Sequence, residues 1–172
     1  ARKNLPPELA QELAEFVDVS VRELLLDRGD FDEDTINEIM DVIHRRMDYA
    51  SKDPDETQED QARRLHKQGG LDNEMVSDAL AMRDYEFVKT AIACLGGAPE
   101  SEIARIMDMK APKAVVAICW KAGLSMRMAF RIQQDMARIS HKELIYPRDG
   151  TDYPLARDEL NWQLEFLGLK AA

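Results

Sequence analysis

One helix-opening pattern decides the fold, and the chain carries it as GDFDEDTINEIM (residues 29–40), GGLDNEMVSDAL (69–80) and GGAPESEIARIM (96–107). Each copy places a glycine before a short polar cap, followed by apolar residues at positions i, i+3 and i+4. The second and third copies stay in register for 27 residues. The matching pairs are Val88 with Val115, Ala91 with Ile118, and Gly96 with Gly123. A period of this length is typical of stacked helical arrays, so the pattern predicts an all-α fold of short antiparallel helix pairs.

The pattern predicts that the whole chain, residues 1–172, forms one helical domain. We expect an N-terminal helical hairpin over residues 1–50, a linker over 51–58 (SKDPDETQ) and the array over 59–172. Each hairpin helix carries an apolar stripe at helical spacing. The first stripe is Leu9, Leu13, Phe16, Val17 and Leu24, and the second is Ile36, Ile39, Met40, Ile43, Met47 and Ala50.

Within the array, the two helices of residues 73–95 are expected to superpose on those of 100–122. Ser125 is a candidate cap for a helix that runs to about Ile139, because a serine side chain accepts hydrogen bonds from a first helical turn. Pro154 is expected to open a last helix that ends near Gly168, since proline is tolerated in a first turn.

The charge of the chain is unevenly distributed. The net charge is −10 over 172 residues, but residues 1–62 carry 18 acidic and 7 basic side chains, a balance of −11. Residues 110–148 carry 8 basic and 2 acidic side chains, a balance of +6. The longest apolar run, Ala114 to Trp120, is far shorter than the roughly 20 residues that cross a bilayer, so no membrane insertion is expected.

No residue pattern in the sequence resembles a catalytic or metal site. His44, His66 and His141 lack metal-ligand neighbours at i+3 or i+4, and neither cysteine has a nearby histidine to activate it. We therefore expect no enzyme activity, no cofactor and no metal, and we interpret His66 as a surface histidine rather than a phosphorelay site. Cys94 and Cys119 lie in apolar helical stretches, which predicts reduced, buried thiols and a cytoplasmic location.

Two surfaces are candidates for binding. On the helix from residue 126 to 139, one face carries a basic stripe made of Arg127, Arg131, Gln134 and Arg138. The last helix has an apolar arc that covers more than half of its circumference. One flank of this arc is Leu155, Trp162, Phe166 and Leu169, and the other is Ala156, Leu160, Leu164 and Leu167.

The chain also resembles a known family in three stretches and in its opening. The stretches are LHKQGGL (65–71), AIACL (91–95) and KAGLS (121–125), and the opening is LPPELA (5–10). The chain is similar, over nearly its whole length, to the C-terminal part of the longer members of a mostly alphaproteobacterial family. This family is known only as a domain of unknown function with HEAT-like helical repeats. The resemblance implies a HEAT-like array, a bacterial cytoplasmic setting and an interaction role, and it brings no catalytic residue.

The sequence thus favours a non-enzymatic helical-repeat module that binds another protein or itself. The flank of Trp162 and Phe166 is the candidate interface, and a homodimer through the last helix is the first hypothesis. The competing hypothesis is that the N-terminal hairpin covers this helix within the same chain. A different class of function, nucleic-acid or phosphoanion binding by residues 110–148, is the alternative. We expect no nucleic-acid binding at physiological salt, because the whole molecule is acidic.

Overall fold

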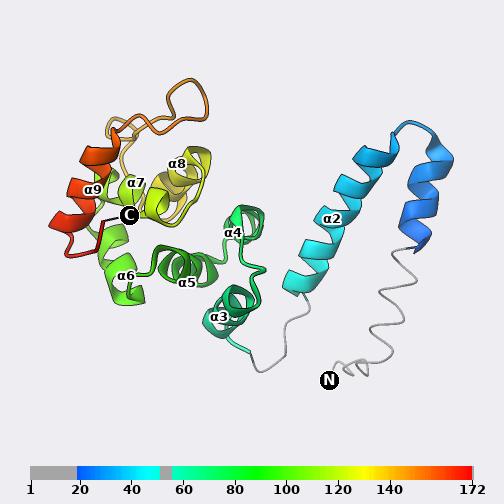
Figure 1. Ribbon diagram of the computed structural model, residues 1–172, viewed down its shortest axis with the longest axis horizontal. Helices are drawn as coiled ribbons and strands as arrows, with labels where there is room; N and C mark the ends of the chain where they lie inside the picture. The colour runs from blue at the N-terminus through cyan, green and yellow to red at the C-terminus, as the bar shows by residue number, and fades with distance from the viewer. Residues whose placement is uncertain (1–18, 51–55, 172) are drawn as a thin grey trace. The chain divides into compact units, whose positions relative to one another are not determined.

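The structure is a computed structural model that describes residues 19–50 and 56–171, with the side chains of all of these except residues 44–50. The described residues form helices and contain no strand; Arg148 and Asp152 make one isolated antiparallel bridge. The predicted all-α class is therefore confirmed (Figure 1). The chain divides into two compact units, Ala1–Ser51 and Lys52–Ala172, and each is described by itself.

The N-terminal unit contains a helix over residues 19–28 and helix α2 (Glu33–Ala50). Gly29 separates them with a left-handed backbone, φ 67°, which glycine adopts without steric cost. The Asp32 carboxylate accepts a hydrogen bond from the Thr35 amide at 2.8 Å. Hydrogen bonding to the Thr35 side chain, and then to its backbone, lowers the pKa of Asp32. Ile36 and Met40 of the predicted second stripe are buried, while Ile39 and Ile43 are half-buried.

One member of the predicted first stripe lies in the wrong place. Leu24 is 66% exposed, because the half-buried apolar side chains of this helix are Val21 and Leu25, four residues apart on one face. The other members of that stripe lie outside the described residues, as do the side chains of Met47 and Ala50.

The C-terminal unit contains seven labelled helices. They are α3 (Gln58–Gln68), α4 (Asn73–Ala81), α5 (Tyr85–Gly96), α6 (Glu100–Asp108), α7 (Pro112–Lys121), α8 (Met126–Asp135) and α9 (Arg157–Phe166). Helices α3, α5 and α7 begin at positions 58, 85 and 112, which are 27 residues apart. The C-cap residues of α4, α6 and α8, which are Met82, Met109 and Met136, have the same spacing. Arg83 and Lys110, also 27 residues apart, both have a left-handed backbone.

Helices α5 and α7, called here the inner helices, hold the core. Helix α5 packs against α3, α4, α6 and α7, and α7 packs in addition against α8 and α9. Every residue from Ala114 to Cys119 on α7 is buried. The inner helices approach closely at Gly96, where an added Cβ atom would lie 3.3 Å from Cδ1 of Ile118. Helix α4 also packs against α8, although α6 lies between them in the sequence.

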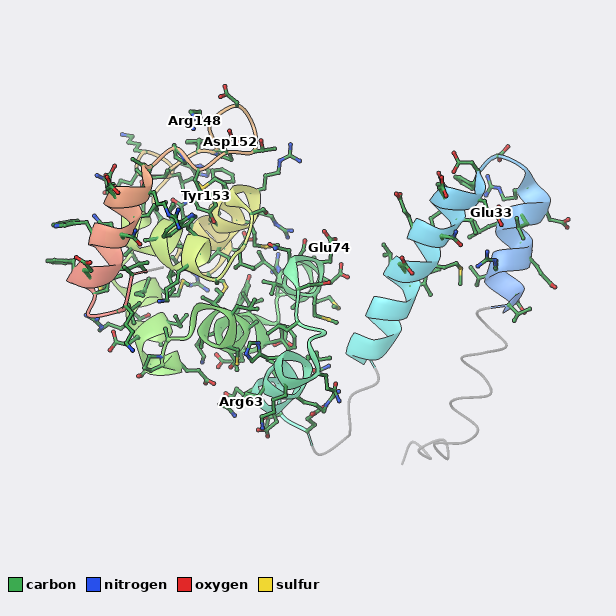
Figure 2. The ribbon with its side chains drawn as sticks, viewed as in Figure 1. Glu33, Arg63, Glu74, Arg148, Asp152 and Tyr153 are labelled. Carbon is green, nitrogen blue, oxygen red and sulfur yellow. The ribbon has the colours of Figure 1, made fainter. Side chains whose placement is uncertain are left out.

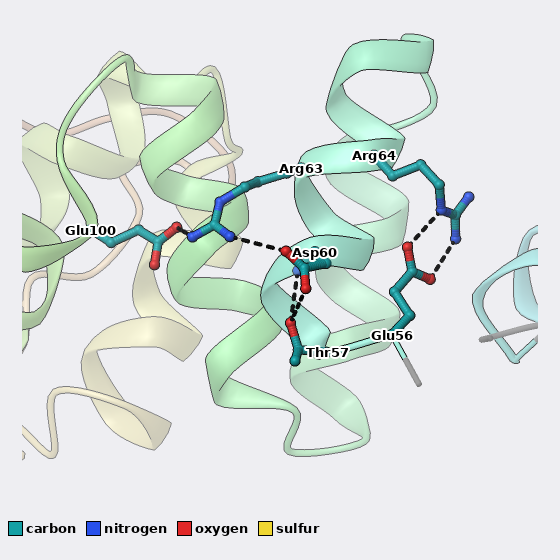
Figure 3. Close-up of polar contacts among 6 residues, drawn as sticks. All are labelled: Glu56, Thr57, Asp60, Arg63, Arg64 and Glu100. Atoms are coloured by element: carbon teal, nitrogen blue, oxygen red, sulfur yellow. Dashed lines mark hydrogen bonds and ion pairs between the residues drawn. The ribbon is translucent and has the colours of Figure 1, made fainter. Parts of the chain in front are cut away.

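Helix α3 is joined to the neighbouring helices by one ion pair as well as by packing on α5. Arg63 on α3 pairs with Glu100 in the first turn of α6, with 2.6 Å between Nη2 and Oε1 (Figure 3). The Thr57 hydroxyl caps α3 by accepting a hydrogen bond from the Asp60 amide. The Arg63–Glu100 pair holds together segments that are 37 residues apart in the sequence.

The two predicted C-terminal helix boundaries are wrong in detail. Helix α8 ends at Asp135 rather than near Ile139, and α9 begins at Arg157 rather than at Pro154. The segment between them, residues 136–156, is irregular and is held by side chains of α8 and of the segment itself. Gln133, fully buried, accepts a hydrogen bond from the Ile145 amide at 3.0 Å and donates one to the Ile145 carbonyl at 3.1 Å.

Candidate protein-interaction site

Helix α9 docks on the array through one face. Leu160 and Leu164 are 2% and 0% exposed, Leu167 directly after the helix is also buried, and α9 packs against α7. These side chains are spaced four and three residues apart, so they share one side of the helix. Leu160, Leu164 and Leu167 of the predicted docking flank therefore face the neighbouring helices. The fourth member of that flank, Ala156, precedes α9 and is exposed.

Polar contacts from α6 and α7 fix both ends of this helix. Near its start, the Lys113 ammonium pairs with Glu159 at 2.7 Å. At its end, the Arg105 guanidinium donates a hydrogen bond to the Leu167 carbonyl at 3.2 Å. The Lys121 ammonium donates another to the Lys170 carbonyl at 2.6 Å. Cations at the C-terminal end of a helix also interact favourably with its dipole, so the orientation of α9 is well defined.

The opposite side of α9 presents two aromatic rings to solvent. Trp162 is 58% exposed and Phe166 is 70% exposed. The two rings stack on each other, with centroids 5.6 Å apart and an interplanar angle of 16°. We call this pair the aromatic pair. The two other predicted interface residues, Leu155 and Leu169, are half-buried and lie just outside α9, so the exposed apolar surface centres on the aromatic pair.

Carboxylates flank the aromatic pair. Asp158 lies one turn before Trp162 and Glu165 lies three residues after it, so both are its neighbours on the helix surface. Both are exposed, and neither forms an ion pair with another residue that the structure describes. Glu159, by contrast, is engaged by Lys113. The outward face of α9 is therefore apolar at its centre and acidic at its edge.

The predicted basic stripe is only partly formed. Arg127, Arg131 and Gln134 share the outward face of α8, but Arg138 follows the end of that helix and has a left-handed backbone, φ 50°. The prediction that Arg138 continues the stripe is wrong, because helical spacing stops at Asp135. Arg127 is exposed but donates a hydrogen bond to the Gly150 carbonyl at 2.9 Å, so it helps to hold the irregular segment.

Sequence reasoning missed an aromatic contact beside the stripe. Tyr146, which is 56% exposed, packs on Phe130 of α8 with ring centroids 4.9 Å apart. Helical spacing gave no signal for it, because Tyr146 reaches α8 through the irregular segment. That segment is further held by the Tyr153 hydroxyl, which donates a hydrogen bond to the Leu124 carbonyl at 2.8 Å. Figure 2 labels Tyr153 together with the bridged residues Arg148 and Asp152.

The cysteines have environments that disfavour the reactive thiolate. Both are free; Cys119 is buried as predicted, and burial raises the pKa of its thiol to about 12. Cys94 is only half-buried, which corrects the prediction, because it lies on the side of α5 near Glu100. Burial and, to a lesser extent, the Glu100 carboxylate raise the pKa of Cys94. A raised pKa makes each thiol a poor nucleophile at neutral pH.

The histidines and acidic groups are dispersed. His66 on α3 and His141 in the irregular segment are exposed, and the side chain of His44 lies outside the described residues. In the part of the chain that the structure describes, no three His, Cys, Asp or Glu side chains are placed to share a metal ion. Nor does any helix in that part combine the length and the apolar content needed to span a bilayer.

The described residues therefore form an all-helical protein whose last helix turns an aromatic face outward. The chain belongs to a family described as an uncharacterised protein conserved in bacteria (DUF2336), whose profile matches residues 1–149. Residues 150–172, which include α9, lie outside the matched segment. No curated protein and no solved structure matches the chain.

Proposed function

We propose that the chain is a non-enzymatic helical-repeat module that binds another protein molecule through the outward face of α9. The observation that carries this proposal is the exposure of the aromatic pair on a helix that is already docked by its opposite face. Exposed tryptophan is costly to leave in water, and aromatic side chains are enriched at the centres of protein interfaces. Because α9 is fixed at both ends, the aromatic pair is presented by a rigid element, which lowers the entropic cost of binding.

The repeat character of the module is part of the same proposal. The 27-residue spacing of helix starts and C-caps supports a HEAT-like array of helix pairs, with α3, α5 and α7 as equivalent second helices. The contact of α4 with α8 distinguishes this arrangement from a simple row of helix pairs, in which α4 would lie against α6. Free thiols with raised pKa values are compatible with the reducing cytoplasm that we propose as its location.

Co-purification from the native cytoplasm tests this function. The wild-type chain is compared with the double variant Trp162→Ser/Phe166→Ser and with the control variant Met82→Ser/Met109→Ser, which removes two exposed apolar side chains from the C-caps of α4 and α6. We expect one protein to remain with the wild type and the control, and to be lost from the α9 variant at unchanged helicity. Retention of the same protein by all three chains would contradict the proposal.

A second candidate function, binding of nucleic acid or of a phosphoanion by residues 110–148, is favoured by the Tyr146–Phe130 contact beside the basic stripe. Exposed aromatic rings next to arginines can stack on bases while the arginines contact phosphates. We expect no such binding at about 0.15 M salt, because phosphate contacts weaken steeply with salt and the chain is acidic overall. Micromolar binding of single-stranded RNA or DNA under these conditions, lost in Arg127→Ala/Arg131→Ala/Arg138→Ala, would reverse the order of the two candidates.

A further inference from the structure

We infer that the partner of α9 is a basic amphipathic helix of another protein, with an apolar face for the aromatic pair and Lys or Arg side chains along its edges. This inference rests on the proposed function and specifies the chemistry of its partner. The charge at the edge of the α9 surface is the observation that points to a basic partner. Asp158 and Glu165 are exposed there, and neither forms an ion pair among the described residues.

The shape of the surface favours a helical partner. Trp162 and Phe166 are four residues apart, so their rings lie one above the other along a single ridge of α9. A ten-residue helix is about 15 Å long, which is the span of three turns of a partner helix. Spacing of anchors at i and i+4 is how amphipathic helices recognise each other. A partner helix laid along this ridge would bring its own flanking residues beside Asp158 and Glu165.

The charge of this chain disfavours two occupants of the α9 face that the chain itself could supply: a second copy of α9 and the N-terminal hairpin. In a two-fold contact between two copies of α9, the Asp158 and Glu165 carboxylates of each copy would gather at one small interface, and like charges placed together at an interface cost binding energy. The N-terminal hairpin is acidic as well, with 13 acidic and 6 basic side chains in residues 1–50. A basic partner instead gains opposite-charge contacts at the edge and a cation–π contact for any Lys or Arg that reaches the face of Trp162.

Charge complementarity at an exposed edge should act mainly on specificity and on the rate of association. Exposed charge pairs are screened by salt, because the Debye length falls from about 30 Å at 0.01 M to about 8 Å at 0.15 M. Binding through this face should therefore combine a salt-resistant apolar contribution from the aromatic pair with a salt-sensitive contribution from Asp158 and Glu165.

Two synthetic 18-residue amphipathic helices with the same leucine face, one edged with lysines and the other with glutamates, serve as probes. Binding of each peptide to the full chain is measured by calorimetry at 0.05 M and 0.3 M salt. We expect the lysine peptide to bind and the glutamate peptide to bind at least about tenfold more weakly. We expect Asp158→Asn/Glu165→Gln to weaken binding of the lysine peptide about fivefold at low salt and to reduce the dependence of that binding on salt.

Matched variants separate the possible failures. Glu23→Gln/Glu38→Gln removes two exposed carboxylates from the N-terminal unit and should leave binding of the lysine peptide unchanged within about twofold. Equal weakening by both charge variants, or equal binding of the two peptides, would overturn the inference of a basic partner. If only Trp162→Ser/Phe166→Ser abolishes binding, the interaction face stands and its basic specificity fails. If that variant changes nothing, the proposed function itself fails.

Discussion

The two units of this chain bury their apolar side chains to very different extents. Among the described residues of the N-terminal unit, Ile36 and Met40 are buried, whereas Val19, Leu24 and Leu26 are all more than half exposed. In the C-terminal unit, the inner helices α5 and α7 are enclosed by neighbours. A helix surrounded by others can bury its whole circumference, while a helix in a pair can bury only one side. We therefore expect stability to reside in the inner helices, and the predictions that follow test this difference.

Truncation of a core side chain on an inner helix gives the largest expected effect. Ile118 is 0% exposed and lies against Gly96, so Ile118→Ala leaves a cavity between the inner helices that the backbone cannot easily close. We expect the free energy of unfolding of the C-terminal unit to fall by about 2 to 5 kcal/mol, measured by urea denaturation. Truncation of the exposed Leu24 in the N-terminal unit, Leu24→Ala, should cost less than about 0.5 kcal/mol. Similar costs for the two substitutions would remove the proposed difference between the units.

The buried amide of Gln133 gives the next largest effect. Its side chain satisfies both the amide and the carbonyl of Ile145, and Gln133→Ala leaves these groups without their partners. An unsatisfied buried group costs about 1 to 3 kcal/mol, and Ile145 is only half-buried, so we expect a loss of about 1 to 2 kcal/mol and faster proteolysis of residues 136–156. The neighbouring half-buried Gln134 provides the control, because Gln134→Ala should change the unfolding free energy by less than about 0.5 kcal/mol. Equal effects would show that Gln133 does not hold the segment.

The contrast between Gln133 and the periodic helices shows what the sequence can predict. Apolar spacing placed the helices of the array and the docked flank of α9, because a buried helix face imposes its period on the sequence. The same reasoning misplaced Arg138 and missed Tyr146, because both lie in an irregular segment held by specific hydrogen bonds. A single buried glutamine has no period, so its role in positioning that segment is visible only in the structure. The width of the apolar arc singled out the flank of Trp162 and left open whether the chain covers it, and helical spacing gave no signal for the stacking of its ring on Phe166.

Alkaline pH should weaken the inner helices by a smaller amount. The pKa of Cys119 rises from 9.0 to about 12 because burial disfavours the thiolate, so the folded chain holds this proton more tightly than the unfolded chain. The resulting stabilisation is complete below pH 9 and is lost as the pH rises from 9 towards 12. We expect a loss of about 1 kcal/mol between pH 9 and pH 10.

Urea unfolding curves at pH 7, 9 and 10 measure this loss. Cys119→Ala should flatten the dependence on pH, whereas Cys94→Ala, which changes a half-buried thiol with a smaller part in the core, should retain most of it. An unchanged slope in Cys119→Ala would assign the alkaline sensitivity to another group, such as Tyr153, whose pKa is also raised by burial.

The smallest expected effect is a gain in stability at Thr90 on the inner helix α5. Thr90 is 0% exposed, and its hydroxyl has no hydrogen-bond partner among the described residues. Valine has nearly the same shape and the same branching at Cβ, so Thr90→Val removes an unsatisfied polar group without a cavity. We expect the unfolding free energy to rise by roughly 0.5 to 1 kcal/mol. The exposed Thr151, whose hydroxyl bonds Asp152, is the control, and Thr151→Val should give no gain. Destabilisation by Thr90→Val would mean that a buried water satisfies the hydroxyl, and that the interior of the array is less dry than its apolar inner helices imply.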